Sequence, residues 1–373
     1  MRVAVIHPWF PQYRLALFHA IRTFAEQEGI TVDIFYGQTP PEWRGRSDSI
    51  SDSVAEELPT RFFHLGNKSI SAKSLTSIRQ GDYDLVIVEQ AVRNVETYKL
   101  LAARRPRVAF WGHGKTYTEQ TSKPQEALKQ FLTRRGRWFF AYTEGGRDAV
   151  VANGFPSDRV SVVMNAVDTR TLRADFDSLT REESASLLGI EAPGPCLLYI
   201  GALDQSKRID FLIETAIKVH ESVADVQLII AGEGAQREQI ESFSLQHPWV
   251  RYVGRLEGRL KAAAFRLAEA VVIPGRVGLV AVDAIACERP VITTDWPLHA
   301  PEFEYLIDGE NAMVAVDSVA DYARAVVTYL QDPNGSVQDS ARSATVRRQL
   351  SVEQAAMNFA QGLKNLGKRE GLL

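Results

Sequence analysis

The stretch AVVIPGRVGLVAVDAIACERPVITT, residues 270–294, decides the predicted fold of this chain. It reads as an apolar strand over 271–273, a turn rich in glycine, an apolar helix over about 279–287 and a second short strand. A glycine turn that leads into a helix presents free backbone N–H groups and the positive end of the helix dipole, so it suits a phosphate group. The alternative is a buried crossover whose glycines only permit tight packing, and the stretch alone leaves both open.

Composition bounds the function. The chain has 373 residues, of which 45% are hydrophobic, and this is enough for two domains of ordinary size. A net charge of −3 gives no general attraction to nucleic acid, so we exclude nucleic acid as a partner. No apolar run approaches the roughly 20 residues of a membrane span, and we expect a soluble, cytoplasmic protein. Cys196 and Cys287 lie in apolar segments, as reduced core thiols do, and no metal-ligand cluster is evident.

Short apolar runs alternate with longer amphipathic ones along both halves of the chain. This alternation, with nearly continuous apolar strands, predicts parallel sheets covered on both faces. We therefore predict an α/β fold with two Rossmann-like doubly wound domains that face each other across a cleft. We expect a helix over 71–79 and a surface loop over 38–57 in the first half. The predicted bounds are 1–168 for the N-terminal domain, 169–192 for a linker, 193–350 for the C-terminal domain and 351–373 for a C-terminal helix that closes the second domain or crosses back to the first.

Polar residues that directly follow strands are candidates for a site, because open parallel sheets bind ligands at the carboxyl ends of their strands. His113 follows a strand in WGHGK, between glycines that let the backbone approach a ligand. Lys207 and Arg208 lie in GALDQSKRID, which begins with Gly201 and follows the strand over 197–200. Two adjacent cations there suit a diphosphate, although a solvated surface is the alternative.

Two further strand ends carry weaker signals. Gly232 and Gly234 follow the strand over 227–231, but the third glycine of the dinucleotide fingerprint is absent, so the sequence indicates a ligand-side turn rather than an NAD or FAD site. His7 ends the first strand, and Tyr13 and Arg14 follow it at the start of a helix. These three residues suit the binding of an acceptor substrate, while simple packing of the loop is the alternative.

Taken in order, these pieces resemble the retaining family 4 glycosyltransferases of the GT-B fold. The resemblance rests on AYTEGGRDAVVANGFPSDRVSVVMNAVD (141–168), GALDQSKRID (201–210), LIIAGEGAQREQIE (228–241), VRYVGRL (250–256) and GRVGLVAVDAIACERPVI (275–292). It implies a nucleotide diphosphate sugar as co-substrate on the C-terminal domain and an acceptor on the N-terminal domain. It also implies that no metal acts at the diphosphate and that no other cofactor takes part.

The resemblance assigns roles to individual residues. Lys207 matches the family's diphosphate lysine, and His113 matches a histidine near the transferred sugar. The segment over 253–256, which contains Arg255, would lie against the base of the donor. The residues that match the backbone cradle for the diphosphate are Gly278, Leu279 and Val280.

Two departures from the family pattern concern charge. Ala202 stands where the family usually has an arginine, so we expect Arg208 to supply that charge. Two family glutamates, which contact the sugar and the ribose, map to Gly275 and Asp283, so the first carboxylate is absent and the second is shortened. A hydrogen bond to a charged group contributes roughly 1.5–3 kcal/mol, so the loss matters. Glu302 and Glu304, in the PEFE segment of HAPEFEYLIDG, are the expected substitutes in a branch that carries a PG-x-VGL turn.

The predicted function is therefore retaining, metal-independent transfer of a sugar to a hydroxyl group of a saccharide, a lipid-linked saccharide or a small molecule. A catalytically silent homologue that binds a nucleotide sugar, and another GT-B enzyme such as a sugar-nucleotide epimerase, are the alternatives. The basic, partly amphipathic segment over 123–140 is either a surface helix or a peripheral docking site on the inner face of the membrane. The sequence leaves the donor, the pathway and the oligomeric state open.

Overall fold

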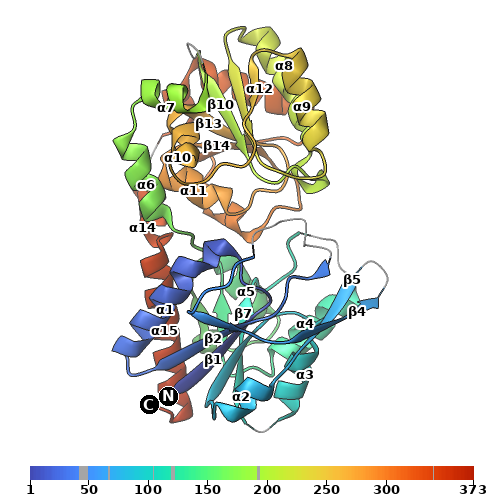
Figure 1. Cartoon of the computed structure of the whole chain (residues 1–373), viewed down its shortest axis with the longest axis vertical. Helices are drawn as coiled ribbons and strands as arrows, with labels where there is room; N and C mark the ends of the chain where they lie inside the picture. The colour runs from blue at the N-terminus through green and yellow to red at the C-terminus, as the bar shows by residue number, and fades with distance from the viewer. Residues whose placement is uncertain (42–48, 66–67, 104, 119–121, 191–193, 339) are drawn as a thin grey trace. The chain divides into compact units, whose positions relative to one another are not determined.

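The computed structural model describes residues 1–41, 49–65, 68–103, 105–118, 122–190, 194–338 and 340–373 (Figure 1). Within these ranges the chain divides into two compact units. The first comprises Met1–Val167 and Val352–Leu373, and the second comprises Asp168–Ser351. Each unit is built on one large parallel sheet with helices around it, so the predicted α/β class with two Rossmann-like domains is confirmed.

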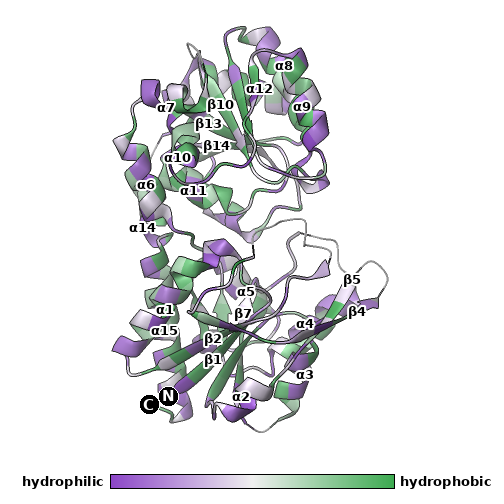
Figure 2. Ribbon diagram, viewed as in Figure 1, coloured by the Kyte–Doolittle hydropathy of each residue, from purple (hydrophilic) through white to green (hydrophobic). Residues whose placement is uncertain are grey.

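The large sheet of the first unit has the strand order β3-β2-β1-β6-β7-β8-β9, and every neighbouring pair is parallel. The strands are β1 Arg2–His7, β2 Thr31–Tyr36, β3 Ala55–Glu57, β6 Leu85–Glu89, β7 Arg107–Gly112, β8 Phe139–Ala141 and β9 Val160–Val162. Central strands such as β1 and β6 are buried at nearly every position, because helices cover both faces of the sheet. Figure 2 shows the apolar strands and the more hydrophilic outer helices.

The helices of the first unit include one from the far end of the chain. They are η1 Gln12–Arg14, α1 Leu15–Gln27, α2 Thr76–Gln80, α3 Val95–Ala102, α4 Lys123–Thr133, α5 Glu144–Ala152, η3 Ser157–Arg159 and α15 Val352–Glu370. α15 packs against α1 and β9, and Phe359 stacks on Phe140 with ring centroids 4.4 Å apart. A side chain at Gly362 would begin 2.6 Å from the Phe140 ring, so glycine lets α15 approach the sheet closely. The two chain ends lie side by side in this unit (Figure 1).

The segment between β2 and β6 differs from the prediction. The expected helix over 71–79 is wrong at its start, because residues 71–73 belong to the strand β5 Lys68–Lys73, which pairs antiparallel with β4 Thr60–Leu65, while α2 confirms a helix over the later residues. The expected loop over 38–57 ends in β3, which extends the large sheet, while residues 42–48 lie outside the described residues. Pairing with the preceding strand β4 overrides the local helical pattern here.

The second unit has a parallel sheet in the order β12-β11-β10-β13-β14-β15. The strands are β10 Cys196–Ile200, β11 Gln227–Ala231, β12 Val250–Tyr252, β13 Ala268–Ile273, β14 Val291–Thr294 and β15 Ala312–Ala315. The stretch over 270–294 supplies β13, helix α11 and β14, and the two strands are neighbours in this sheet. Cys196 and Cys287 are free and buried, as expected.

The helices of the second unit begin where the sequence predicted a linker. They are α6 Thr169–Ser178, α7 Arg181–Leu188, η4 Gln205–Lys207, α8 Ile209–Ser222, α9 Arg237–Gln246, α10 Gly258–Leu267, α11 Val280–Ala286, η5 Pro301–Tyr305, α12 Val319–Gln331, α13 Pro333–Ser336 and α14 Ala341–Gln349. α6 and α7 pack against α10, and a capping box between Thr180 and Glu183 starts α7. The segment over 169–190 is therefore a folded part of the second unit, and residues 191–193 lie outside the described residues.

Candidate active site

The turn between β13 and α11 is fixed by the loops that follow two neighbouring strands. On one side, the N–H of Arg276 donates to the carbonyl of Ser206, 2.9 Å away. On the other, the N–H of Val277 donates to Nδ1 of His299 at 3.1 Å, and the hydroxyl of Thr294 donates to the carbonyl of Pro274 at 3.0 Å. These bonds hold the backbone of the turn in one conformation at the carboxyl end of the sheet.

Three backbone donors in this turn have no acceptor within the described residues. They are the N–H groups of Gly278, Leu279 and Val280, which are partly exposed. The carbonyls of Gly278 and Leu279 already accept from Ala281 and Val282, so the backbone at this point is in a helical arrangement. The residues predicted to form the backbone cradle thus present N–H groups that an anionic ligand can occupy.

Lys207 lies beside this turn. It is the last residue of η4, and its Nζ donates to the carbonyl of Arg276 over 2.5 Å. A Cβ atom at Gly201 would lie 3.8 Å from Nζ, an ordinary van der Waals distance, so the ammonium group lies beside the end of β10. Lys207 and the three N–H groups therefore flank the same short turn.

The side chain of Arg208 contacts several neighbouring residues. Its guanidinium forms an ion pair with Asp317, donates to the carbonyl of Pro274 at 3.3 Å, and lies 4.2 Å from the centroid of the Phe211 ring. The residue also adopts a left-handed backbone with φ of 57° where α8 begins. Arg208 is thus held beside the turn, but part of its charge is already compensated by Asp317.

The structure explains the glycine at position 275. A Cβ atom there would lie 2.6 Å from the carbonyl oxygen of Ser206 and 2.7 Å from that of Lys207. The loop after β10 occupies the space that the family's first glutamate would need, so only glycine fits.

The expected substitutes differ in their placement. Glu302 is 3% exposed, and its Oε2 would lie 4.0 Å from a Cβ atom at Gly278. Glu304 is exposed. Of the two glutamates in η5, Glu302 is therefore the one that the structure brings to the turn.

Asp283 holds a buried carboxylate on α11. Its Oδ2 pairs with Nζ of Lys261 at 2.7 Å, while Oδ1 is buried and has no hydrogen-bond partner within the described residues. Asp283 is only 8% exposed, so its Oδ1 is a buried acceptor that lacks a hydrogen-bond donor within the described residues.

The other predicted donor-side residues serve packing or lie at the surface. A Cβ atom at Gly232 would lie 1.8 Å from the carbonyl oxygen of Gly201, and one at Gly234 would lie 2.3 Å from that of Leu203. The two glycines therefore allow the loops after β10 and β11 to touch. Arg255 is exposed and pairs with Glu257 at 2.8 Å.

The sequence analysis missed His299, which joins two loops of the site. Nδ1 accepts the N–H of Val277, and Nε2 lies 2.8 Å from the carbonyl of Thr294, so the neutral ring donates from Nε2. Burial lowers the pKa of His299, and the positive charges of Lys207 and Arg208 lower it further, although the bond to Thr294 opposes this. Sequence analysis considered only the glutamates of the PEFE segment. Residue spacing gives no sign that His299, three residues before Glu302, bonds to Val277.

In the first unit, the predicted acceptor residues gather at the ends of β1, β7 and β8. Nδ1 of His7 donates to the carbonyl of Trp9, 2.5 Å away. Burial and then the charge of Arg14 lower the pKa of His7 to about 3, so its ring is neutral at pH 7. The guanidinium of Arg14 lies 5.2 Å from the ring centroid of Tyr13. The structure thus brings the three predicted residues together.

His113 follows β7 and is solvent-exposed, with its ring centroid 4.7 Å from that of Tyr142. Desolvation, and then the positive charges of Lys129 and Arg14, lower the pKa of His113. A Cβ atom at Gly114 would lie 2.1 Å from the carbonyl oxygen of Gly146. This flanking glycine therefore lets the loop pack against α5.

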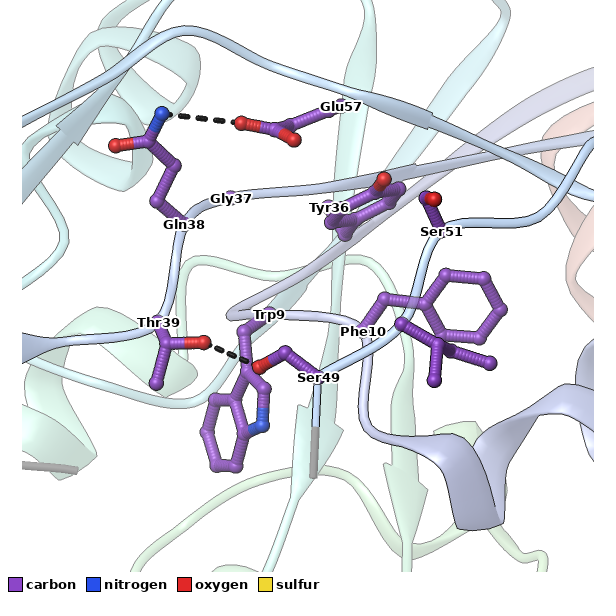
Figure 3. A pocket seen from close by; sticks show the side chains of 10 residues that line it. Trp9, Phe10, Tyr36, Gly37, Gln38, Thr39, Ser49, Ser51 and Glu57 are labelled. Atoms are coloured by element: carbon purple, nitrogen blue, oxygen red, sulfur yellow. Dashed lines mark hydrogen bonds between the residues drawn. The ribbon is translucent and has the colours of Figure 1, made fainter. Parts of the chain in front are cut away.

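A pocket of about 600 Å³ lies at the carboxyl ends of β1, β2 and β3 (Figure 3). Trp9, Phe10 and Tyr36 line it with aromatic rings. Its polar side includes Gln38, whose Nε2 donates to Oε1 of Glu57 at 3.0 Å. Sequence analysis missed this pocket because its residues come from four separate segments of the chain.

Two family models match the chain, one in each half. Residues 17–171 match the model described as Glycosyltransferase Family 4, and residues 194–332 match the model described as Glycosyl transferases group 1. The solved structure of HepE from Anabaena with UDP-glucose superposes with a TM-score of 0.67 at 14% identity, covering 97% of this chain and 99% of that one. The chain has the GT-B fold. Each of its two units matches a glycosyltransferase family model, and the two matches support a family 4 type protein.

Curated relatives of this GT-B chain align over part of their length. Glycogen synthase of Mycobacterium tuberculosis is 32% identical over 162 residues, which cover 41% of this chain and 38% of that protein. Phosphatidyl-myo-inositol mannosyltransferase of Mycobacterium leprae is 31% identical over 168 residues, 42% of each chain. The alignments thus span less than half the length of these relatives.

The described residues offer neither a membrane-spanning helix nor a metal-binding cluster. No helix there combines the length and the apolar character that crossing a membrane requires. No group of three or more His, Cys, Asp or Glu side chains in those residues is arranged to hold a metal ion.

Proposed function

We propose that this chain transfers a sugar from a nucleotide diphosphate sugar to a hydroxyl acceptor, with retention of anomeric configuration. The observation that carries the proposal is the turn after β13, where the N–H groups of Gly278, Leu279 and Val280 lack an acceptor within the described residues and Lys207 lies alongside. Backbone donors and an ammonium group suit diphosphate oxygens. The GT-B fold and both family matches support the activity, and the family 4 resemblance supports retention.

The chemistry follows from where charge develops. As the bond from the sugar to the diphosphate breaks, negative charge grows on the leaving oxygen. The Lys207 ammonium and the N–H groups of the turn are fixed before the reaction, so they stabilise this charge most strongly in the transition state. Because these groups supply positive charge from the chain itself, we propose that no metal acts at the diphosphate.

We assign the remaining donor contacts to two buried carboxylates. Glu302, whose carboxylate approaches Gly278, is placed to accept hydrogen bonds from the transferred sugar in place of the missing family glutamate. Oδ1 of Asp283 is placed to accept from a ribose hydroxyl, while Lys261 holds the other oxygen in position. A hydroxyl group would satisfy a buried oxygen that otherwise has no partner in the described part of the chain.

We assign the acceptor to the first unit. His7, Tyr13 and Arg14 lie together at the end of β1, and exposed His113 lies close to Tyr142 at the ends of the neighbouring strands. The aromatic pocket in Figure 3 suits a saccharide, since rings cover the apolar faces of sugars and polar side chains bond their hydroxyl groups. The acceptor class is therefore a saccharide, free or lipid-linked, or a small polyol.

Release of nucleoside diphosphate tests the proposal. The full chain is incubated with UDP-, GDP- and dTDP-sugars and a panel of saccharide and polyol acceptors, and products are followed by mass spectrometry. We expect one donor to release its nucleoside diphosphate faster with an acceptor than without, and NMR of the product to show the donor's anomeric configuration. No consumption of any donor with any acceptor would refute transfer, and an inverted product would refute retention.

A second candidate is epimerisation of a nucleotide sugar. The solved UDP-GlcNAc 2-epimerase from Methanocaldococcus jannaschii superposes with a TM-score of 0.61 at 14% identity over 97% of this chain, so the fold alone does not separate the two activities. The same donor panel separates them, because an epimerase converts a nucleotide sugar in the absence of an acceptor. A catalytically silent homologue would bind a donor and leave it unchanged under every condition.

A further inference from the structure

Arg14 is a buried cation without a counter-charge. The residue is 3% exposed, and no carboxylate pairs with it in the described ranges. Its Nη2 donates to the hydroxyl of Tyr142 at 3.2 Å and to Oδ1 of Asn165 at 2.8 Å, and both of these partners are neutral. Its Nε and Nη1 are buried and have no acceptor at all among the described residues. A guanidinium stays charged in proteins, so the first unit buries a full positive charge here.

The surroundings do not cancel this charge. The guanidinium lies 5.2 Å from the ring centroid of Tyr13, 5.4 Å from that of Trp111 and 5.3 Å from that of Tyr142. The positive charge of Arg14 is also felt by His7 and His113, whose pKa values it helps to lower. Aromatic rings attract a cation only weakly, and they accept none of its in-plane N–H bonds.

A third buried donor lies in the same cluster. Nε1 of Trp111 is buried and has no acceptor within the described residues. Burying polar donors without acceptors is costly, and burying an unpaired charge is more so, which is why native proteins rarely keep such groups without a reason. Three buried donor nitrogens of this cluster, Nε and Nη1 of Arg14 and Nε1 of Trp111, thus lack an acceptor within the described residues.

The cluster lies where a ligand can bind. Arg14 follows β1, Trp111 is in β7 and Tyr142 follows β8, so all three are at the carboxyl edge of the sheet. The Tyr142 ring also contacts the exposed ring of His113 at a centroid distance of 4.7 Å. Tyr142, which accepts a hydrogen bond from Arg14, therefore links the cluster to exposed His113 within the same unit.

We propose that Arg14 binds an oxyanion group, a phosphate or a carboxylate, carried by the glycosyl acceptor. This inference rests on the proposed function and deepens it, because it names the acceptor as an anionic saccharide or polyol. The oxyanion would supply acceptors for Nε and Nη1 and a counter-charge for the guanidinium. Nε and Nη1 of Arg14 are buried in the unliganded chain. The surrounding aromatic rings would therefore move to let the oxyanion reach them.

Three small probes on one carbon scaffold test this proposal. Glycerol 3-phosphate, glycerate and glycerol offer a phosphate, a carboxylate and no charge, and the Tm of the full chain is measured with each at constant ionic strength. We expect at least one anion to raise the Tm of the wild type and of the Lys207→Met variant, which removes the donor-side lysine. The anion that raises the Tm more shows whether Arg14 binds a phosphate or a carboxylate. Glycerol leaves the Tm unchanged.

The decisive variant is Asn165→Asp, which has nearly the same shape and places a carboxylate beside Nη2. An internal counter-charge competes with the ligand, so we expect anion affinity to fall about ten- to a hundredfold. Arg14→Gln removes the positive charge altogether, and we expect this second variant to lose anion affinity as well. The matched control is Arg137→Met, which removes an arginine from the other edge of the same sheet and keeps wild-type anion binding.

The outcomes separate this inference from the proposed function. If neither anion stabilises the wild type more than glycerol does, or if Asn165→Asp binds the anion as tightly as the wild type, Arg14 is a structural cation and the inference is overturned. If the wild type releases no nucleoside diphosphate from any donor, the proposed function fails, whatever the anions do. Release that is equally fast with neutral and anionic acceptors keeps the function and overturns the inference.

Discussion

The replacement Lys207→Met probes the donor site through a single charge. Methionine keeps most of the length and the apolar stem of lysine but lacks the ammonium group. In the structure that group donates to the carbonyl of Arg276 at 2.5 Å and lies beside the turn whose N–H groups we assign to the diphosphate. The variant therefore removes one positive charge and leaves the backbone donors of the turn in place.

The expected loss follows from the kind of bond removed. A hydrogen bond between an ammonium group and a diphosphate oxygen contributes about 1.5–3 kcal/mol, which corresponds to a roughly 10- to 150-fold lower kcat/KM. The effect on folding is smaller, because a hydrogen bond such as the one to the carbonyl of Arg276 contributes about 1 kcal/mol to stability. Activity should thus fall far more than stability.

Nucleoside diphosphate release by the full chain gives kcat/KM, and a thermal melt gives Tm for the same preparations. Lys218→Met is the matched control, because Lys218 is exposed on α8 and contributes nothing to the turn. We expect wild-type turnover from the control and a loss of at least tenfold from Lys207→Met. Equal kcat/KM for the wild type and both variants would show that the ammonium group does not act on the diphosphate.

Four further changes have defined outcomes. Gly275→Glu forces a side chain against the loop after β10, so we expect a loss of about 1–3 kcal/mol of unfolding free energy by denaturant titration and no gain in activity; a more active variant would show that this loop does leave room for a glutamate. Glu302→Gln should lower kcat/KM about tenfold or more while Glu304→Gln changes it little, and the reverse order would contradict our assignment. The pKa of His7 is about 3 in the folded chain and 6.5 ordinarily, so the stability of its neutral ring is present above pH 6.5 and is lost as the pH falls toward 3; the Tm of His7→Gln should vary less across that window, and an identical profile would rule this out. Phe131, 45% exposed on basic helix α4, is our candidate for peripheral membrane contact, and Phe131→Glu should abolish co-sedimentation with anionic vesicles; if the wild type itself stays in the supernatant, that contact is excluded.

The sequence predicted the architecture because its signals are local. Alternating apolar strands and amphipathic helices define parallel sheets, and the glycine turn over 274–280 marks the end of β13. The hairpin of β4 and β5 was missed because KSISAK and the residues after it also fit a helical spacing. Only pairing with β4 distinguishes the two, and that pairing is a property of the folded chain.

In the candidate site, too, local sequence signals predicted some features, while others depend on contacts in the folded chain. Lys207 and the turn were predicted from strand ends, whereas the reason for glycine at position 275 became clear only from the backbone of the loop after β10. His299 was missed because its role depends on two hydrogen bonds to distant backbone groups. A lack of partners, as at Arg14, cannot be read from residue spacing, because it depends on every side chain that packs around the group.

Amide hydrogen exchange tests the central claim most directly. The full chain is exchanged with and without a saturating nucleoside diphosphate, chosen from UDP, GDP and dTDP by its effect on Tm, and peptides are analysed by mass spectrometry. If the N–H groups of Gly278, Leu279 and Val280 bind the diphosphate, exchange slows in the peptide that contains them, and Lys207→Met weakens that protection. A nucleotide that binds and protects other segments, while exchange over 278–280 stays unchanged, would contradict the donor site proposed for this chain.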